Sequence, residues 1–264
     1  ALFHTMFNLA NVFLLIWFVP QLVSFAEKSV KSRGEADEEF KLDYISGPLG
    51  STAELCILEA KKEVAKFGRT TSKMNTFVHT HLNSTDRKEK NKMLTKIEKY
   101  EEITDRVEVE IADYLGQTAR LEMSDEASIR MRGMLNITTD LERIGDIFFQ
   151  ISKTLERKDN DKTYFLPEQR NGLNKMLKVV EEAFEIMNQN LNSEYGSISI
   201  ESAIAKEREI NQLRDVLRGE HLALIGSGGK TENALIYSNM FSSLEKVGDH
   251  IINVSEQVAN KNLN

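Results

Sequence analysis

The spacing of hydrophobic residues predicts helices over most of this chain. From about residue 51 to the C-terminus, hydrophobic positions recur every three or four residues, the period of a helix that buries one face. Breaks rich in Gly, Ser, Asp and Asn interrupt the pattern. Two of these breaks, at 83–88 and 122–125, offer Ser, Thr and Asp as helix starts. The pattern therefore predicts six helices, at about 51–82, 87–121, 125–158, 167–191, 197–225 and 231–260.

Two of these helices are related by an internal repeat. The phrase "LERIGD" at 141–146 returns as "LEKVGD" at 244–249, 103 positions later. Around each phrase runs a hydrophobic seam of the kind that antiparallel helical bundles bury. The two seams are Met134, Ile137, Leu141, Ile144, Phe148, Ile151 and Leu155, and Tyr237, Met240, Leu244, Val247, Ile251, Val254 and Val258. We therefore predict an all-α fold of two tandem three-helix bundles, at 51–160 and 161–264.

The N-terminal stretch has a different composition. Residues 1–26 contain no Lys, Arg, Asp or Glu. A helix of this length, rising 1.5 Å per residue, can cross a hydrocarbon core of about 30 Å. Lys28, Lys31 and Arg33 follow directly, which places the rest of the chain on the cytoplasmic side by the positive-inside rule. We predict a membrane helix at 1–26 and a connector at 27–50. The alternative is a buried helix of a soluble bundle. Because the chain starts with Ala inside an apolar run, we expect it to be part of a longer protein.

Composition and isolated motifs argue against several classes of function. A net charge of −7 disfavours nucleic acid as a partner and favours cations. Cys56 is the only cysteine, so no intrachain disulfide forms. The phrase "GSGGKT" at 226–231 lacks the first glycine of a phosphate-binding loop, so we expect a flexible loop there. His79 and His81 diverge on a helix and are expected to be structural or surface residues. With no nucleophile and base arrangement evident, we expect that the chain is not an enzyme.

Acidic residues four positions apart recur on the second and third helices of each bundle. Such pairs lie on one face, one turn apart, so two pairs on neighbouring helices gather four oxygen-bearing side chains. Clustered carboxylates repel one another unless a cation neutralises them, and hard cations prefer oxygen ligands. We therefore predict a metal site in each bundle, weaker in the second because an asparagine replaces one acid. The predicted ligands are Glu101, Asp105, Glu142 and Asp146 in the first bundle and Glu207, Asn211, Glu245 and Asp249 in the second.

A solvated helix face is the alternative explanation of these acids. Arg143 and Lys246 stand beside them in the sequence and could pair with them. Against this, Gly145 and Gly248 each cost about 1 kcal/mol relative to alanine inside a helix. Their recurrence indicates close approach of another backbone or of a ligand at both positions.

The repeated helices resemble a known family. "DLERIGDIFFQISKTL" (140–155) and "LEKVGDHIINVSEQV" (244–258) are similar to the signature helices of the PhoU family of phosphate-uptake regulators. The resemblance implies two three-helix bundles and multinuclear metal clusters, often iron, bound by E-x-x-x-D motifs on neighbouring helices. "EEITDRVEVEI" (101–111) resembles the second-helix motif, whereas "EREINQL" (207–213) departs from it at Asn211.

The flanking segments resemble parts of a transporter. "HTMFNLANVFLLIWFVP" (4–20) is similar to the last membrane helix of bacterial sodium/phosphate cotransporters, and residues 40–68 resemble the segment that joins their membrane domain to a C-terminal PhoU-like domain. This implies the regulatory end of a sodium-dependent phosphate symporter in the inner cell membrane. Its bundles would be cytoplasmic and its partner the upstream transporter domain, with a homo-oligomer left open. Sodium and phosphate would bind only the full-length transporter.

Two other classes of function stay open at this point. One is a soluble PhoU-type phosphate-signalling regulator that docks on a transporter or a sensor kinase. The other is a structural helical interaction module that holds no metal.

Overall fold

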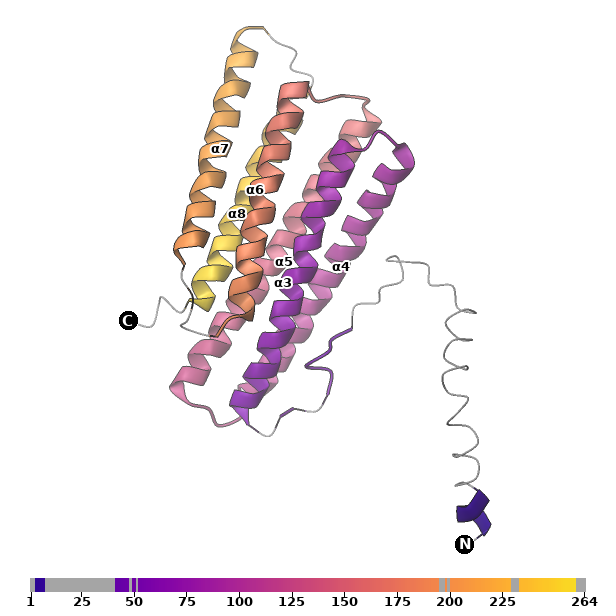
Figure 1. Ribbon diagram of the computed structural model, residues 1–264, viewed down its shortest axis with the longest axis vertical. Helices are drawn as coiled ribbons and strands as arrows, with labels where there is room; N and C mark the ends of the chain where they lie inside the picture. The colour runs from indigo at the N-terminus through magenta and orange to yellow at the C-terminus, as the bar shows by residue number, and fades with distance from the viewer. Residues whose placement is uncertain are drawn as a thin grey trace. The chain divides into compact units, whose positions relative to one another are not determined.

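Helices form nearly all of the described part of the chain (Figure 1). The computed structural model describes residues 3–7, 41–47, 49–50, 52–194, 198, 200–228 and 233–259. It divides the chain into two units, Ala1–Lys41 and Leu42–Asn264. In the second unit the long helices are α3 (Ala53–Asn83), α4 (Arg87–Thr118), α5 (Asp125–Asn160), α6 (Pro167–Asn192), α7 (Glu201–Gly226) and α8 (Ala234–Val258).

These helices pack as two bundles of three. In the first bundle α3, α4 and α5 contact one another, and in the second α6, α7 and α8 do so. The bundles join where α3 packs on α6 and α5 packs on α8. Every residue of the two predicted seams is buried, because the seams face these contacts. The predicted all-helical tandem fold is confirmed.

Local sequence explains most of the helix boundaries. The Asp86 side chain accepts a hydrogen bond from the backbone N–H of Lys88 at the start of α4, and the Ser124 hydroxyl accepts one from Ala127 at the start of α5. Three predicted boundaries differ from the observed ones by three or more residues, and one of them is the start predicted at 231, which lies at Ala234. The helix predicted to 121 ends at Thr118, where i+3 hydrogen bonds tighten the last turn. The helix predicted from 197 begins at Glu201, since the hydrophobic period does not register the start of the first turn.

The predicted membrane helix falls almost entirely outside the described residues. Of residues 1–26 the structure describes only 3–7, which are helical. None of the helices that the structure describes is both long and apolar enough to span a bilayer. The first part of the predicted connector, residues 27–40, also lies outside the description.

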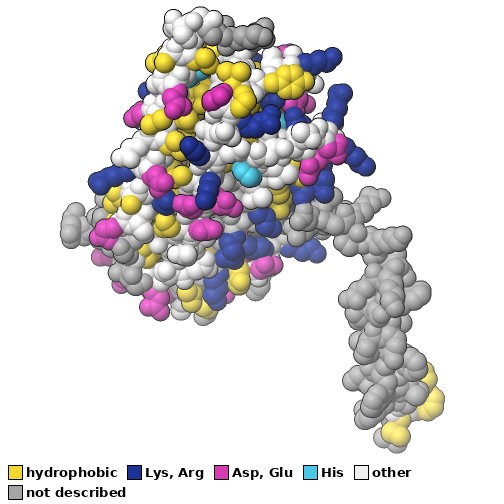
Figure 2. Space-filling model, turned by 45° about the horizontal axis from the view of Figure 1, so that its top comes forward, with side chains coloured by type: hydrophobic (Ala, Val, Ile, Leu, Met, Phe, Trp, Pro, Cys, Tyr) yellow, Lys and Arg dark blue, Asp and Glu magenta, His cyan; other side chains and the backbone are white. Residues whose placement is uncertain are grey.

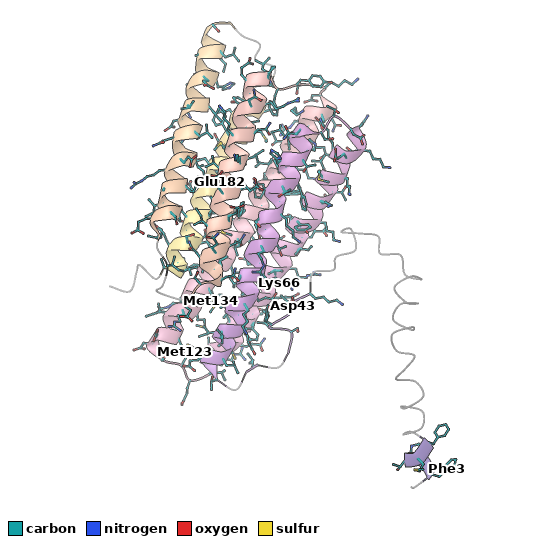
Figure 3. The ribbon with its side chains drawn as sticks, viewed as in Figure 1. Phe3, Asp43, Lys66, Met123, Met134 and Glu182 are labelled. Atoms are coloured by element: carbon teal, nitrogen blue, oxygen red, sulfur yellow. The ribbon has the colours of Figure 1, made fainter. Side chains whose placement is uncertain are left out.

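The end of the connector is attached to α3 by a buried carboxylate. Glu63 has no exposed surface, and one of its oxygens accepts hydrogen bonds from the backbone N–H groups of Asp43 and Tyr44, both at 2.9 Å. The Lys66 ammonium lies 2.6 Å from the Asp43 carboxylate (Figure 3). The chain just before the first bundle therefore packs as part of that bundle.

Candidate metal site

A glycine sets the distance between α4 and α5. A Cβ atom added at Gly145 would lie 2.5 Å from Oγ1 of Thr104, which is too close for any real contact. The Thr104 hydroxyl donates a hydrogen bond to the carbonyl oxygen of Glu101, at 2.8 Å, so its position is fixed. In the second bundle a Cβ at Gly248 would lie 2.9 Å from Cδ1 of Ile210. The close approach at both glycines is therefore that of a side chain from the neighbouring helix, and not that of a backbone or a ligand as the sequence predicted.

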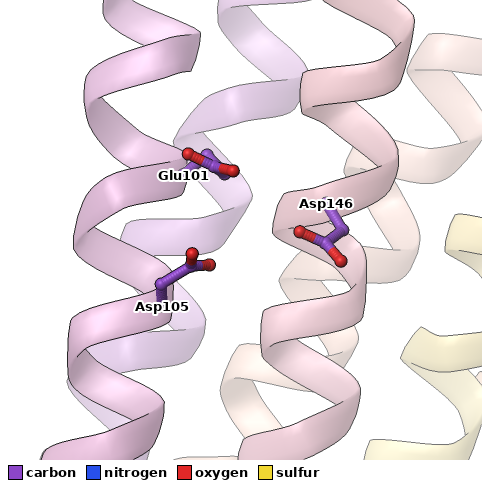
Figure 4. A group of neighbouring side chains, drawn as sticks. All are labelled: Glu101, Asp105 and Asp146. Carbon is purple, nitrogen blue, oxygen red and sulfur yellow. The ribbon is translucent and has the colours of Figure 1, made fainter.

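Three of the four acids predicted as ligands in the first bundle lie together. Glu101 and Asp105 extend from α4 and Asp146 from α5, and one carboxylate oxygen of each lies within 4.8 Å of the others (Figure 4). Glu101 is half-buried, while Asp105 and Asp146 are exposed. Oxygens that share one calcium-sized or manganese-sized cation are spaced by roughly 3–5 Å, since metal–oxygen distances are about 2.1–2.6 Å. The three carboxylates could therefore bind the same cation.

The fourth predicted ligand, Glu142, lies one turn before Asp146 on α5. Burial raises its pKa to about 7, and repulsion from Asp146, Glu108 and Asp105 adds to this. In its protonated form the Glu142 carboxyl donates a hydrogen bond to Asp146. Burial and repulsion from Asp146 also raise the pKa of Asp105. The carboxylates of the cluster therefore repel one another, and a bound cation would reduce this repulsion.

One member of the cluster was missed by the sequence reasoning. Glu108 lies on α4, one turn beyond Asp105, and adds to the repulsion that raises the pKa of Glu142. Its carboxylate accepts a hydrogen bond from the Thr139 hydroxyl at 3.2 Å. The signal that could have found it is the extended pattern E-x-x-x-D-x-x-E at 101–108, which puts a third acid on the same helix face.

The corresponding residues of the second bundle are arranged differently. The Asn211 amide donates a hydrogen bond to Glu207 on α7. On the facing helix α8, Glu245 accepts a hydrogen bond from Arg214, with 2.6 Å between Oε1 and Nη1. Burial, followed by repulsion from Glu245 and Glu207, raises the pKa of Asp249. Among the described residues, the grouping of three metal-ligating side chains occurs in the first bundle and not here.

Arg143 and Lys246 are the basic residues that could form ion pairs with the acids beside them in the sequence. Both side chains are exposed, and in the described residues neither lies within ion-pairing distance of the four acids of its own bundle. Neutralisation by these neighbours therefore does not account for the first cluster.

The raised pKa of Glu142 predicts a pH dependence of stability. In the metal-free protein, folded Glu142 holds its proton to about pH 7, whereas an unfolded glutamate loses it near pH 4.5. The folded state binds more protons between these values, so the free energy of unfolding should fall as pH rises from about 4.5 through 7. Glu142→Gln should flatten this slope and stabilise the protein at pH 8 by about 1 kcal/mol, a value reduced for solvent screening.

Chemical denaturation in EDTA across this pH range measures the effect. The matched control is Glu185→Gln, which removes an exposed carboxylate from α6. Equal slopes for the two variants would contradict a special role of Glu142.

Two tandem three-helix bundles, with a group of acids on facing helices of the first, define the fold class. The sequence pattern of the PhoU domain family matches residues 66–155 and 173–258, more than half of the chain, and the chain belongs to this family. No curated protein matches the chain significantly.

Two solved structures share the fold. The crystal structure of the phosphate transport system regulatory protein PhoU from Streptococcus pneumoniae is similar with a TM-score of 0.66 and 19% identity, over 78% of this chain and 95% of that chain. PhoU from Pseudomonas aeruginosa is similar with a TM-score of 0.62 and 15% identity, over 78% of this chain and 96% of that chain. At such identities the likeness shows the fold alone.

Proposed function

We propose that this chain regulates phosphate transport, and that it acts by binding and not by catalysis. The observation that carries the proposal is the match of the PhoU domain family to both bundles. The shared fold with a phosphate transport system regulatory protein supports it. Because the described unit spans nearly the full length of that protein, a regulatory role requires no transporter helices within this chain.

The regulator would hold a divalent cation in its first bundle. Glu101, Asp105 and Asp146 would supply the ligand oxygens, and Glu142 would join them once deprotonated. The ligands are all oxygen, which suits iron, manganese, magnesium or calcium in preference to softer metals. When bound, the cation would neutralise the cluster. The contact between Thr104 and Gly145 sets the spacing of α4 and α5 at which these acids face one another.

The expected partner is a protein component of phosphate transport, either a transporter or a sensor kinase. On the face shown in Figure 2, Lys and Arg side chains are interspersed with Asp and Glu side chains. Nucleic-acid binding generally requires clustered basic residues, so this mixture and the net charge of −7 favour a protein surface as partner.

A second candidate function places the same bundles inside a transporter. Its specific support is the uncharged stretch at 1–26, followed by Lys28, Lys31 and Arg33. In this case the bundles are the cytoplasmic C-terminal domain of a sodium-dependent phosphate symporter in the inner membrane. The solved structures support the first candidate, because the match covers 95% and 96% of their chains.

Phosphate uptake by cells tests the proposal that the chain regulates phosphate transport, which both candidates share, and it distinguishes the two candidates. Cells that lack these residues should lose the normal response of uptake to external phosphate, and expression of residues 1–264 should restore it. For a docking regulator, residues 42–264 should restore it equally well. For a transporter domain, only a chain attached to the membrane should do so.

Uptake that is unchanged by the deletion in both phosphate-rich and phosphate-poor medium would contradict the proposal. Vesicles that contain this chain alone should show no sodium-driven phosphate uptake.

A further inference from the structure

The structure fixes how the two bundles correspond, residue by residue. Thr104 packs against Gly145 in the first bundle, and Ile210 packs against Gly248 in the second. These contacts relate α4 to α7 by 106 positions and α5 to α8 by 103 positions. Under the same correspondence, the acids at 101, 105, 142 and 146 match Glu207, Asn211, Glu245 and Asp249, which supports the alignment independently.

A charge reversal lies at the centre of this correspondence. With the offset of 106 positions between α4 and α7, the residue equivalent to Glu108 is Arg214. Glu108 adds repulsion to Glu142, whereas Arg214 forms an ion pair with Glu245, the equivalent of Glu142, at 2.6 Å. The carboxylate of the adjacent, exposed Asp215 also lies 2.8 Å from Nε of Arg214. With 19% of its side chain exposed, Arg214 is largely enclosed by the second bundle.

We propose that Arg214 is a built-in cation that takes the place of a metal ion in the second bundle, so that the chain binds divalent cations in its first bundle only. This inference rests on the proposed metal site of the first bundle and names the residue that makes the two halves different.

The donor sets support this difference. In the first bundle Glu101, Asp105 and Asp146 lie together, and Glu142 and Glu108 place two further carboxylates on the same helices, α5 and α4. The second holds three carboxylates with the permanently charged guanidinium of Arg214, and its fourth position, Asn211, donates a hydrogen bond to Glu207. A divalent cation entering there would have to displace the guanidinium or be repelled by it. Arginine does not lose its proton in proteins, so this obstacle exists at every accessible pH.

The consequence is a regulator with one metal-dependent half and one metal-independent half. In the first bundle Asp105 of α4 and Asp146 of α5 repel one another unless a metal ion neutralises them, while in the second bundle Arg214 of α7 and Glu245 of α8 form an ion pair within the chain. Chelators should therefore alter the first bundle and leave the second unchanged.

Manganese binding to the full chain tests the inference. Isothermal titration and metal analysis of the wild type should show Mn²⁺ binding that Asp146→Asn weakens about 100-fold and that Asp249→Asn leaves unchanged. The double variant Arg214→Glu with Asn211→Asp gives the second bundle the same acids as the first bundle has at the equivalent positions. It should take up additional Mn²⁺, at least tenfold more tightly at the second bundle than its control, and should keep that binding when Asp146→Asn is added.

The control carries Arg218→Glu with Asn211→Asp, the same charge change one turn further along α7, where the side chain is exposed. If the charge reversal prevents folding, as judged by circular dichroism, Arg214→Gln removes the cation alone and should gain weaker Mn²⁺ binding. Equal uptake by the Arg214 variants and the control would overturn the inference, as would wild-type binding that depends on Asp249. If wild type binds no metal but the double variant does, the proposed first site fails while the role of Arg214 stands.

Discussion

Replacing Asp146 with asparagine should weaken Mn²⁺ binding by this chain about 100-fold, because the loss of an outer partner of a metal ligand alone costs roughly 10–100-fold. Asp146 is the acid that α5 contributes to the group within 4.8 Å, and it also repels Glu101, Asp105 and Glu142. Asparagine keeps the shape of the side chain and one oxygen but removes the charge. The repulsion that makes a cation favourable would therefore decline together with the ligand itself.

Calorimetric titration of metal-free protein measures this change. The control variant is Asp113→Asn, which removes one exposed carboxylate from α4 outside the cluster and changes the net charge equally. A similar loss in both variants would indicate a general charge effect. Full binding in the Asp146 variant would show that the ligands proposed for the first bundle are wrong.

Substituting Gly145 with alanine should destabilise the protein by about 1–3 kcal/mol, although alanine normally favours a helix over glycine. The added Cβ would lie 2.5 Å from Thr104 Oγ1 and 3.1 Å from its Cβ. Thr104 is fully buried and hydrogen-bonded to the Glu101 carbonyl, so the strain would move α4 away from α5. Because Glu101 and Asp105 belong to α4 and Asp146 to α5, the same variant should bind Mn²⁺ more weakly.

The same helix supplies a matched control. A Cβ at Gly133 would meet its nearest atoms at 3.9 Å, an ordinary contact. Gly133→Ala should therefore stabilise the protein by about 0.5–1 kcal/mol and leave Mn²⁺ affinity unchanged. Urea denaturation in EDTA compares the two variants. Stabilisation of both would show that α5 and α4 do not depend on glycine for their contact.

Much of the fold could be predicted from the order of residues, because helices are local structures. The spacing of Leu141, Ile144 and Phe148 by three and four predicts the buried face without knowledge of its partner. Asp86 and Ser124 are capping residues that act on backbone groups within three residues. The start at Glu201 escaped prediction because no side chain caps it.

The candidate site was predictable only in part. The repeated phrase contains Glu142 and Asp146, and the same spacing on the preceding helix identified Glu101 and Asp105, since residues four apart share a helix face. The sequence alone could not decide what the glycines face, because Gly145 and Thr104 come from different helices. Glu108 was missed for a similar reason, since its importance comes from its position near Glu142 on the facing helix.

The sequence by itself therefore determined the helices, their buried faces, the tandem repeat and most of the acids. The sequence indicated a weaker second site through Asn211, but only the tertiary structure decided that Arg214 pairs with Glu245 there. Glu108 and Arg214 occupy equivalent positions, but whether such a residue repels or neutralises an acid depends on distances between helices. Electrostatic interactions act through space, and their strength falls with separation and solvent exposure, which hydrophobic spacing along one helix does not report.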